Sequence, residues 1–271
     1  MTAASRAADL AFATALAERA GELLVDRFEK VEHIDYKSAK DVVTEVDRMS
    51  ENLIIEAIRA EHPGDGIIAE ESGDHATGAG NAPTEGIGRA WVIDPLDGTI
   101  NYANGIPFFC VSIALVEGGV PVVGVIHDPI RHETYAATDD GPATVDGREI
   151  RAGTKTDLND YVISMSLAGS ALIGRSRAVR KAVRVPRSMG SAALALAYVA
   201  NGRFDAMVQQ GGLSLWDIAA AGLIAERGGA RVTNLEGGAW FSVSLEPRTI
   251  SILAAPPAHH DELLKIVRGG R

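Results

Sequence analysis

The segment 91–99 constrains this chain more than any other, because a short apolar run stops there in two carboxylates, a proline and a glycine. Its first three residues, Trp-Val-Ile, are strand formers, and Pro95 is expected to end the strand because proline has no N–H for a sheet ladder. Gly98 permits a backbone geometry that a side chain would obstruct. The pattern predicts a strand that leads into a rigid turn carrying Asp94 and Asp97.

Two carboxylates that converge on one turn repel each other unless a proton or a metal ion lies between them. Hard oxygen ligands such as Asp94 and Asp97 favour Mg²⁺. The backbone N–H groups of Gly98 and Thr99 can meet an anion beside such an ion. A solvated Asp-Pro turn is the alternative interpretation of the same residues, so the rest of the chain has to corroborate the metal site.

The charge of the chain restricts its partners. The 271 residues carry a formal net charge of −10. A protein that binds the nucleic-acid backbone concentrates lysine and arginine, so no nucleic acid is expected as a partner. Between Ala90 and Ile130 there is no lysine or arginine, although this span holds the central turn. A phosphate bound there would need cations from solution, which favours the metal interpretation.

Cys110 is the only cysteine, so no internal disulfide can form and the reducing environment of the cytoplasm is the expected localisation. It stands in the apolar run Phe-Phe-Cys-Val, which is typical of a buried, inert thiol rather than a nucleophile. No stretch approaches the ~18 uninterrupted apolar residues of a membrane span. We therefore expect no membrane partner.

Helical and strand patterns alternate along the chain, which predicts α/β packing with sheets covered by helices. One expected helix begins at Thr44 as N-cap and ends at Pro63. The other expected helices cover residues 4–28, 175–183, 191–200, 215–227 and 258–268. The expected strands cover residues 67–69, 109–116, 120–126, 133–137, 161–165, 205–208, 230–233 and 251–255.

Two segments without periodicity divide the chain. Residues 73–88 are rich in Gly, Ala and Thr and are expected to form a surface loop or lid. Residues 138–160 are dense in Asp, Gly and Thr, and the expected domain boundary falls inside them, near Ile150. We therefore expect an N-terminal subdomain over residues 1–150 and a C-terminal subdomain over residues 151–271.

Carboxylates recur at the ends of other predicted elements. Glu70 and Glu71 follow the strand 67–69, Asp217 opens a helix, and Asp47 stands where a capping-box acid would stand. Each has a structural alternative: a solvated strand end, a charge at the positive end of a helix dipole, and a helix cap. Open α/β folds build their sites at strand ends and helix starts. Taken together, these positions indicate a cluster for bivalent metal ions.

Four motifs carry a resemblance to a known family: Asp41-x-Val43-Thr44-x-x-Asp47, Glu70-Glu71-Ser72, Asp94-Pro95-Leu96-Asp97-Gly98-Thr99-Ile100-Asn101-Tyr102 and Trp216-Asp217. Over nearly its whole length the chain resembles the inositol monophosphatase family. This family belongs to the Mg²⁺-dependent, Li⁺-sensitive phosphatases that also include the fructose-1,6-bisphosphatases. The resemblance implies an α/β (α+β) fold, a layered αβαβα sandwich, and hydrolysis of small phosphate monoesters.

The resemblance implies two to three Mg²⁺ ions per active site. One ion would be held by Glu70, Asp94 and the carbonyl group of Leu96. A second would be held by Asp94, Asp97 and Asp217, and a third, weaker ion would lie near Glu70.

The resemblance also implies how the phosphate is bound and attacked. Gly98 and Thr99 would present N–H groups to the phosphate, in agreement with the interpretation of the turn itself. Thr99, paired with Asp47, would orient and help to deprotonate the attacking water. Glu70 would join these two as a catalytic residue. We therefore expect direct hydrolysis without a phosphoenzyme.

The resemblance places the substrate contacts at the central turn and at two helix starts, with one more on a strand between them. They are Asp97, Gly190, Ser191, Ala192, Gln210 and Asp217. Ser191 is equally typical of a plain helix cap. Members that hydrolyse inositol phosphates usually have a glutamate where this chain offers Gln209 or Gln210, which keep the hydrogen bonds and lose the charge.

The expected substrate is a small phosphorylated metabolite, with myo-inositol-1-phosphate as the first choice. Histidinol phosphate and fructose-1,6-bisphosphate stay open. A nucleotide 3′-phosphate is disfavoured by Ile100, where that branch usually carries lysine. By resemblance alone we expect a homodimer. The alternative from a different class is a regulatory binding protein that keeps the fold without turnover, and the intact carboxylate set counts against it.

Overall fold

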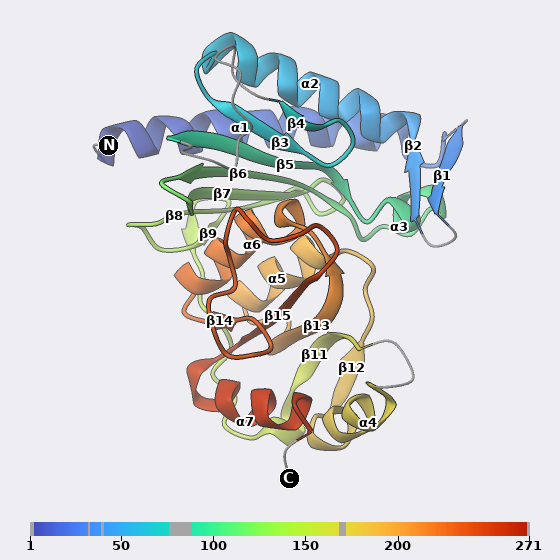
Figure 1. Ribbon diagram of the computed structural model, residues 1–271, viewed down its shortest axis with the longest axis vertical. Coiled ribbons are helices and arrows are strands. Elements are labelled where there is room, and N and C mark those ends of the chain that lie inside the picture. Colours follow the sequence, from blue (N-terminus) through green and yellow to red (C-terminus); the bar gives the residue numbers. More distant parts are fainter. Residues whose placement is uncertain (1–2, 32, 39–40, 76–87, 168–171, 270–271) are drawn as a thin grey trace.

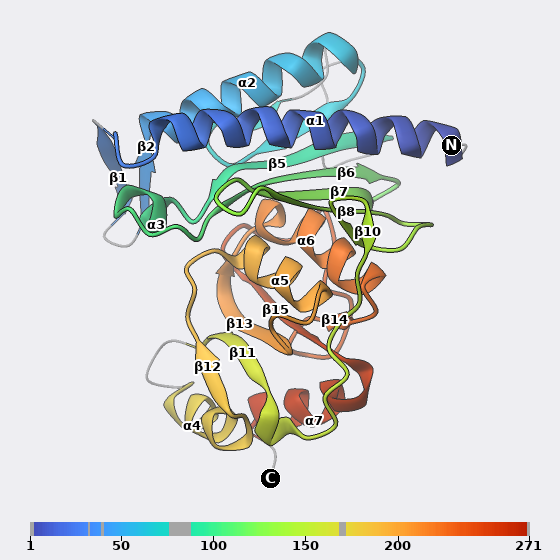
Figure 2. The same cartoon turned by 180° about the vertical axis from the view of Figure 1, so that it is seen from behind.

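The computed structural model describes residues 3–31, 33–38, 41–75, 88–167 and 172–269. Within them, helices and sheets alternate in layers, as Figures 1 and 2 show. The layers are the helix pair α1 and α2, a large sheet, the pair α5 and α6, a smaller sheet, and the pair α4 and α7. The protein is therefore the αβαβα sandwich expected from the sequence.

The outer layer on the large sheet consists of α1 (Ala3–Arg27) and α2 (Glu45–Glu61). A hairpin of β1 (Ile34–Ser38) and β2 (Asp41–Thr44) lies between them in the chain. A Cβ at Gly21 of α1 would lie 2.3 Å from Cδ2 of His127 in the large sheet, so glycine lets α1 pack closely on this sheet. The residues that α1 buries follow the predicted helical spacing: Ala13, Leu16, Ala17, Ala20 and Leu24.

The large sheet has eight described strands in the order β10-β9-β8-β7-β6-β5-β3-β4. Its central strands are nearly continuous runs of buried residues because helices cover both faces of the sheet. The strands are β3 (Gly66–Ala69), β4 (Gly73–His75), β5 (Arg89–Asp97), β6 (Cys110–Glu117), β7 (Val120–Asp128), β8 (Glu133–Thr138), β9 (Thr144–Val145) and β10 (Arg148–Glu149).

Strand β5 differs from the sequence prediction at Pro95. Asp94 pairs with Ser112 and Asp97 with Cys110, so β5 holds one more residue than β6 in this interval. The prediction that Pro95 ends the strand was wrong, because the extra residue forms a bulge and a proline in a bulge costs no ladder hydrogen bond. The bulge bends the strand at the point where the carboxylates emerge.

The middle layer consists of α5 (Ala192–Ala200) and α6 (Leu215–Arg227), which lie between the two sheets. Both helices are rich in buried alanine, since small side chains let the sheets approach them from both sides. A Cβ at Gly124 on β7 would lie 2.7 Å from the carbonyl oxygen of Ala220 on α6. This contact brings α6 directly against the strand.

The smaller sheet has five described strands in the order β12-β11-β13-β15-β14. They are β11 (Val162–Ser166), β12 (Val185–Arg187), β13 (Ala206–Leu213), β14 (Arg231–Thr233) and β15 (Ile250–Ala255). The last layer, α4 (Ile173–Ala182) and α7 (Pro257–Val267), covers its outer face.

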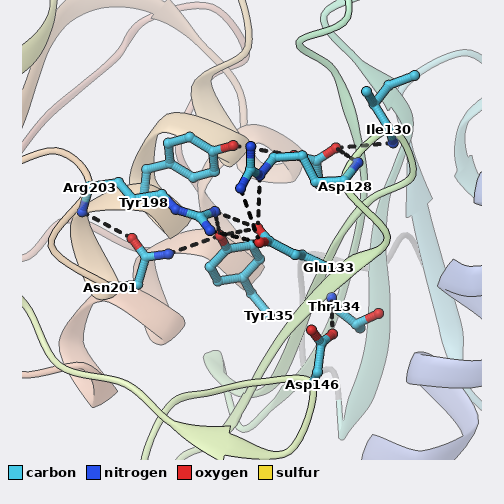
Figure 3. A network of polar contacts seen from close by, with 10 residues as sticks. Asp128, Ile130, Glu133, Thr134, Tyr135, Asp146, Tyr198, Asn201 and Arg203 are labelled. Carbon is cyan, nitrogen blue, oxygen red and sulfur yellow. Dashed lines mark hydrogen bonds and ion pairs between the residues drawn. The ribbon is translucent and has the colours of Figure 1, made fainter.

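A network of polar contacts fastens β8 to the chain that follows α5 (Figure 3). The guanidinium group of Arg203 pairs with the carboxylate of Glu133 and donates to the hydroxyl of Tyr135 at 2.6 Å. The same group lies 4.9 Å from the ring centroid of Tyr198. Hydrogen bonding to Arg203 is the main reason why the pKa of Glu133 falls to about 2. The large sheet is thus tied to α5 through β8.

The structure differs from the sequence prediction in some loops and short elements, and it leaves the predicted domain boundary untested. The predicted lid over residues 73–88 begins with β4, and residues 76–87 of it lie outside the described residues. The short elements β9, β10, β12 and α3 (Thr99–Ala103) were not predicted. The boundary near Ile150 falls between β10 and the short helix η1 (Leu158–Asp160), and the division at this point stays a prediction. No helix in the described part of the chain is long and apolar enough to cross a membrane.

Candidate active site

The site begins at the end of β5, where the bulge holds Asp94 and Asp97 in the interior. The N–H of Leu96 donates to Oδ1 of Asp94 at 3.0 Å and fixes that carboxylate. From α2, the hydroxyl of Ser50 donates to the carbonyl oxygen of Pro95 at 3.0 Å. The turn is therefore anchored by its own backbone and by the helix packed above it.

Asp217 enters the same space from the first turn of α6. The N–H of Ser214 donates to Oδ2 of Asp217 at 2.6 Å, so the predicted helix-start role is present. From β6, the hydroxyl of Ser112 donates to the carbonyl oxygen of Trp216 at 3.0 Å and holds α6 against the large sheet. One carboxylate oxygen from each of Asp94, Asp97 and Asp217 lies within 4.8 Å of the others.

This carboxylate cluster fits a bivalent cation by the chemistry of its donors. Burial raises the pKa of Asp94 well above its ordinary value, and the charges of Glu70, Asp97 and Asp217 raise it further. Burial, followed by the charges of Asp97 and Glu70, does the same to the pKa of Asp217. Buried carboxylates that repel one another in this way are the oxygen ligands that Mg²⁺ prefers.

Glu70 follows β3, the parallel neighbour of β5, and its carboxyl group is hydrogen-bonded to that of Asp94. It lines the same cavity, as does Leu96. The backbone N–H of the next residue, Glu71, donates to the carboxylate of Glu51 on α2 at 2.8 Å. The structure thus brings the predicted metal residues together and ties the turn after β3 to the outer helix layer.

Asp47 is the helix cap that the sequence allowed, and it also contacts Thr99. Its Oδ2 accepts from the N–H and the hydroxyl of Thr44 at 2.8 and 2.6 Å, which caps α2. Its Oδ1 lies 2.8 Å from the hydroxyl oxygen of Thr99, and that hydroxyl is also 3.0 Å from the carbonyl oxygen of Leu96. Burial raises the pKa of Asp47, while the hydrogen bonds from Thr44 and Thr99 lower it.

Gly98 has a φ of 103°, in the left-handed region, and precedes α3. A side chain here would be strained by this backbone angle, and its Cβ would lie only 3.1 Å from the carbonyl oxygen of Phe108, so glycine suits the position. Asn101 on α3 donates to the carbonyl oxygens of Phe108 and Met189, each at 2.7 Å. Asn101 therefore fixes the turn against the segment that leads into α5.

Asp97 connects the cluster to α5. Its Oδ2 accepts from the hydroxyl of Ser191 at 2.6 Å and from the N–H of Ala193 at 2.7 Å. Burial raises the pKa of Asp97, and these two hydrogen bonds oppose the rise. Ser191 also accepts from the N–H of Leu194 at 3.3 Å, so it is the helix cap that the sequence allowed.

Two adjoining cavities open from the cluster. The first, of about 210 Å³, is here called the metal cavity. It contains the carboxylates, Gly98, Thr99 and Arg248. The second, of about 230 Å³, is here called the ring cavity. The two share Asp97, Gly190, Gly212 and Asp217.

The ring cavity is lined largely by hydroxyl, amide and thioether groups. Gly190, Ser191 and Ala192 belong to it as predicted positions, whereas Gln209 lines it and Gln210 lines neither cavity. Substrate contact by Gln210 stays a prediction. Sequence reasoning missed several lining residues that belong to no motif: Ser164, Ser166, Ser188, Met189 and Met207.

Two other titratable side chains are buried near or behind the site. Burial, with the charges of Asp97 and Asp94, raises the pKa of the Cys110 thiol well above its ordinary value, which agrees with an inert thiol. His127 on β7 has Nδ1 2.9 Å from the hydroxyl oxygen of Thr134, and burial lowers its pKa to about 4. His127 thus packs between sheet and α1, in agreement with a structural role.

The layered fold gathers carboxylates from the end of β5 and from the start of α6 in one cavity, together with the hydroxyl group of Thr99. The chain belongs to the inositol monophosphatase family, whose sequence model matches residues 6–270. This confirms the resemblance carried by the four motifs.

Individual relatives and one solved structure are similar to this chain over most of its length. The chain is 39% identical over 234 residues to the Nus factor SuhB of Xylella fastidiosa, covering 82% of this chain and 80% of that one. It is 34% identical over 263 residues to the fructose-1,6-bisphosphatase/inositol-1-monophosphatase of Thermotoga maritima, covering 95% of each. The crystal structure of the extragenic suppressor protein suhB from Bartonella henselae is similar with a TM-score of 0.87 and 32% identity, covering 97% of this chain and 100% of that one.

Proposed function

We propose that this protein is a Mg²⁺-dependent phosphatase that hydrolyses small phosphate monoesters, with myo-inositol-1-phosphate as the expected substrate. The observation that carries the proposal is the convergence of Asp94, Asp97 and Asp217 within 4.8 Å, in one cavity with Thr99, whose hydroxyl donates to the buried carboxylate of Asp47. The cavity thus combines metal ligands with a hydroxyl group held by a carboxylate.

Glu70, Asp94 and the Leu96 carbonyl would hold one Mg²⁺, and Asp94, Asp97 and Asp217 a second, with a third near Glu70. When bound, these ions would neutralise the charge of the phosphate and make a nearby water more acidic. Asp94 and Asp97 are buried, and one oxygen of each lies within 4.8 Å of the other, so the protein would supply the ligands in a preorganised form.

The chain's own groups then handle the proton and the phosphate. The hydroxyl of Thr99 donates a hydrogen bond to Asp47, so its lone pairs can accept one from the attacking water. As the water oxygen forms its bond to phosphorus and the ester P–O bond breaks, the water proton passes to Oγ1 of Thr99 while the Thr99 hydroxyl proton passes to Asp47. The N–H groups of Gly98 and Thr99 would donate to the phosphate oxygens. The alcohol product keeps the ester oxygen and takes a proton from solvent.

The alcohol part of the substrate would occupy the ring cavity, where Ser164, Ser166, Ser188 and Gln209 can exchange hydrogen bonds with a polyhydroxylated ring. This supports an inositol or sugar phosphate. The relative from Thermotoga maritima, named for both fructose-1,6-bisphosphate and inositol-1-phosphate, keeps the bisphosphate open. Histidinol phosphate and nucleotide 3′-phosphates remain further candidate substrates.

The test is phosphate release from myo-inositol-1-phosphate, histidinol phosphate, fructose-1,6-bisphosphate and 3′-phosphoadenosine 5′-phosphate. Each is assayed with Mg²⁺, with EDTA, and with Mg²⁺ plus Li⁺. We expect release that needs Mg²⁺ and falls with Li⁺. In H₂¹⁸O, the label should appear in inorganic phosphate and never in phosphate trapped on the enzyme. Folded protein that binds Mg²⁺ and releases phosphate from none of these would contradict the proposal.

A homodimer and a cytoplasmic location complete the proposal. A second candidate function, regulatory binding beside or without catalysis, is favoured by the name of the Xylella fastidiosa relative, a Nus factor. One experiment separates the two candidates. If binding is the function, a variant without phosphatase activity replaces the wild-type protein in cells, and if catalysis is the function, it does not.

A further inference from the structure

The side chain of Asn101 connects two segments that lie far apart in the sequence. Asn101 stands on α3, directly after the central turn, and is almost completely buried. Its Nδ2 donates to the carbonyl oxygen of Phe108, which follows α3, and to that of Met189, which precedes α5. Both partners are carbonyl oxygens, so only a group with two donors fits between them. A carboxylate of the same shape could make neither contact.

Gly190 lies between two residues that are held by the segment 97–101. Asn101 binds the carbonyl group of Met189 on one side of it, and Asp97 accepts from the hydroxyl of Ser191 on the other. Gly190 has a φ of 84°, and a Cβ there would lie 2.8 Å from Nδ2 and from Oδ1 of Asn101. The backbone at Gly190 therefore packs directly on the amide group of Asn101, and this amide fixes its position.

This contact lies where the two cavities meet. Gly190 lines both the metal cavity and the ring cavity, and Met189 lines the ring cavity. A substrate with its phosphoryl group at Gly98 and Thr99 and its alcohol part in the ring cavity would pass Gly190 with its ester bond. The hydrogen bonds of Asn101 therefore set the distance between the wall of the ring cavity and the turn that would bind the phosphoryl group.

We propose that Asn101 is a positioning residue that aligns the alcohol part of the substrate with the phosphoryl group. The inference rests on the proposed phosphatase function and applies to any ester that fills both cavities. In-line displacement requires the attacking water, the phosphorus atom and the leaving oxygen to lie on one axis. A misplacement of about 1 Å between reacting groups can cost on the order of 10²-fold in rate. Asn101 lines neither cavity, so it would act through the backbone of Met189 and Gly190.

The test variant is Asn101→Leu, which keeps the branched shape of the side chain and replaces the amide by methyl groups. It is compared with wild type at saturating Mg²⁺, on the ester of the assay above that wild type hydrolyses best. Two constants are measured together. KM of the ester depends on both cavities, whereas Ki of inorganic phosphate, added as a competitive inhibitor, depends on the phosphate-binding turn alone.

The two constants should respond differently in Asn101→Leu. We expect KM to rise at least about fivefold and kcat/KM to fall about 10- to 100-fold, because two hydrogen bonds that place the wall of the ring cavity are lost. Ki of inorganic phosphate should change less than about threefold, since the turn keeps its own contacts. A smaller fraction of folded molecules would lower the rate without changing KM, so the rise in KM separates positioning from a merely structural role.

Asn104→Leu is the matched control. Asn104 follows the same helix, and its Nδ2 donates to the carbonyl oxygen of Ile100 at 2.8 Å, a contact that does not reach α5. This variant should leave KM, kcat and Ki unchanged. Asn101→Ala is a second test variant that leaves room for water to meet both carbonyl groups, and it is judged by the same constants if the leucine variant does not fold.

A rise of Ki in parallel with KM would overturn the inference, because Asn101 would then support only the turn that binds phosphate. A lower kcat at unchanged KM would overturn it as well, and so would no change in either constant or an equal effect of Asn104→Leu. Failure of both Asn101 variants to fold would assign Asn101 to the fold alone and overturn it too. These outcomes leave the proposed phosphatase standing. Only a wild type without Mg²⁺-dependent release from any ester would remove both.

Discussion

Replacing Asp94 by asparagine should stabilise the metal-free protein while removing its activity. The substitution deletes one charge from the buried cluster and keeps an oxygen to accept the hydrogen bond from Leu96, 3.0 Å long in the wild type. Two unit charges 4.8 Å apart, the limit that spans this cluster, repel by about 3 kcal/mol at an effective dielectric constant of ~20. Charges closer together than this repel more strongly, and a proton shared within the cluster relieves part of the repulsion.

The assay is thermal unfolding of wild type and Asp94→Asn, in EDTA and in a Mg²⁺ series, beside phosphate release. In EDTA the variant should melt several degrees above wild type, since about 1 kcal/mol shifts the melting temperature of a chain of this size by ~2–4 °C. Wild type should gain about 2.7 kcal/mol at a Mg²⁺ concentration 100-fold above Kd. The variant should gain much less and lose several orders of magnitude in turnover.

Glu149→Gln, an exposed carboxylate paired with Arg151, controls for the general effect of removing an acid from a chain of net charge −10. It should leave both the Mg²⁺ response and the turnover unchanged. The reasoning is refuted if Asp94→Asn melts below wild type in EDTA, or if it keeps the full Mg²⁺ response or near-normal turnover.

Three further predictions concern other parts of the molecule. Thr99→Val should lower kcat by about 10²- to 10⁴-fold with little change in melting temperature, and steady-state kinetics measures the fall. The reason is that the variant lacks the hydroxyl group that pairs with Asp47 and orients the water. The folded pKa of His127, about 4, lies below the ordinary 6.5, so the unfolded chain binds this proton first as pH falls. The protein should therefore lose about 3 kcal/mol through this group by pH 4, and urea unfolding of wild type and His127→Gln at pH 7 and 5 should show a smaller pH dependence for the variant. Gly124→Ala should cost about 1–3 kcal/mol, because the new Cβ would lie 2.7 Å from the carbonyl oxygen of Ala220, and thermal unfolding would show a lowered midpoint.

The fold could be predicted from the sequence largely because periodicity and capping residues are local signals. The spacing of α1 and the capping box of Thr44 and Asp47 each depend on neighbouring residues, and both are present in the structure. The bulge at Pro95 could not be read locally, since it depends on how β6 pairs with β5.

The site shows the same division. The carboxylates at strand ends were found because they belong to motifs, and the structure brings Asp94, Asp97 and Asp217 together. Arg248 was not assigned and Gln209 stayed one of two alternatives, because their place at the cavities depends on the irregular pairing of β13 with β15 rather than on nearby residues. Motifs locate the reacting atoms, whereas the groups that recognise the rest of the substrate come from packing.

The hydrogen bonds from Ser191 and Ala193 to Asp97 connect residues that lie 94 and 96 positions apart in sequence, so the site is built from two distant parts of the chain. A chimera of two related phosphatases with a crossover near residue 150 would take Asp97 from one parent and its α5 partners and Asp217 from the other. Such a chimera would be active only if the parents agree in the position of α5 to a fraction of an ångström. Sequence change at the start of α5 is therefore constrained by a carboxylate on the large sheet.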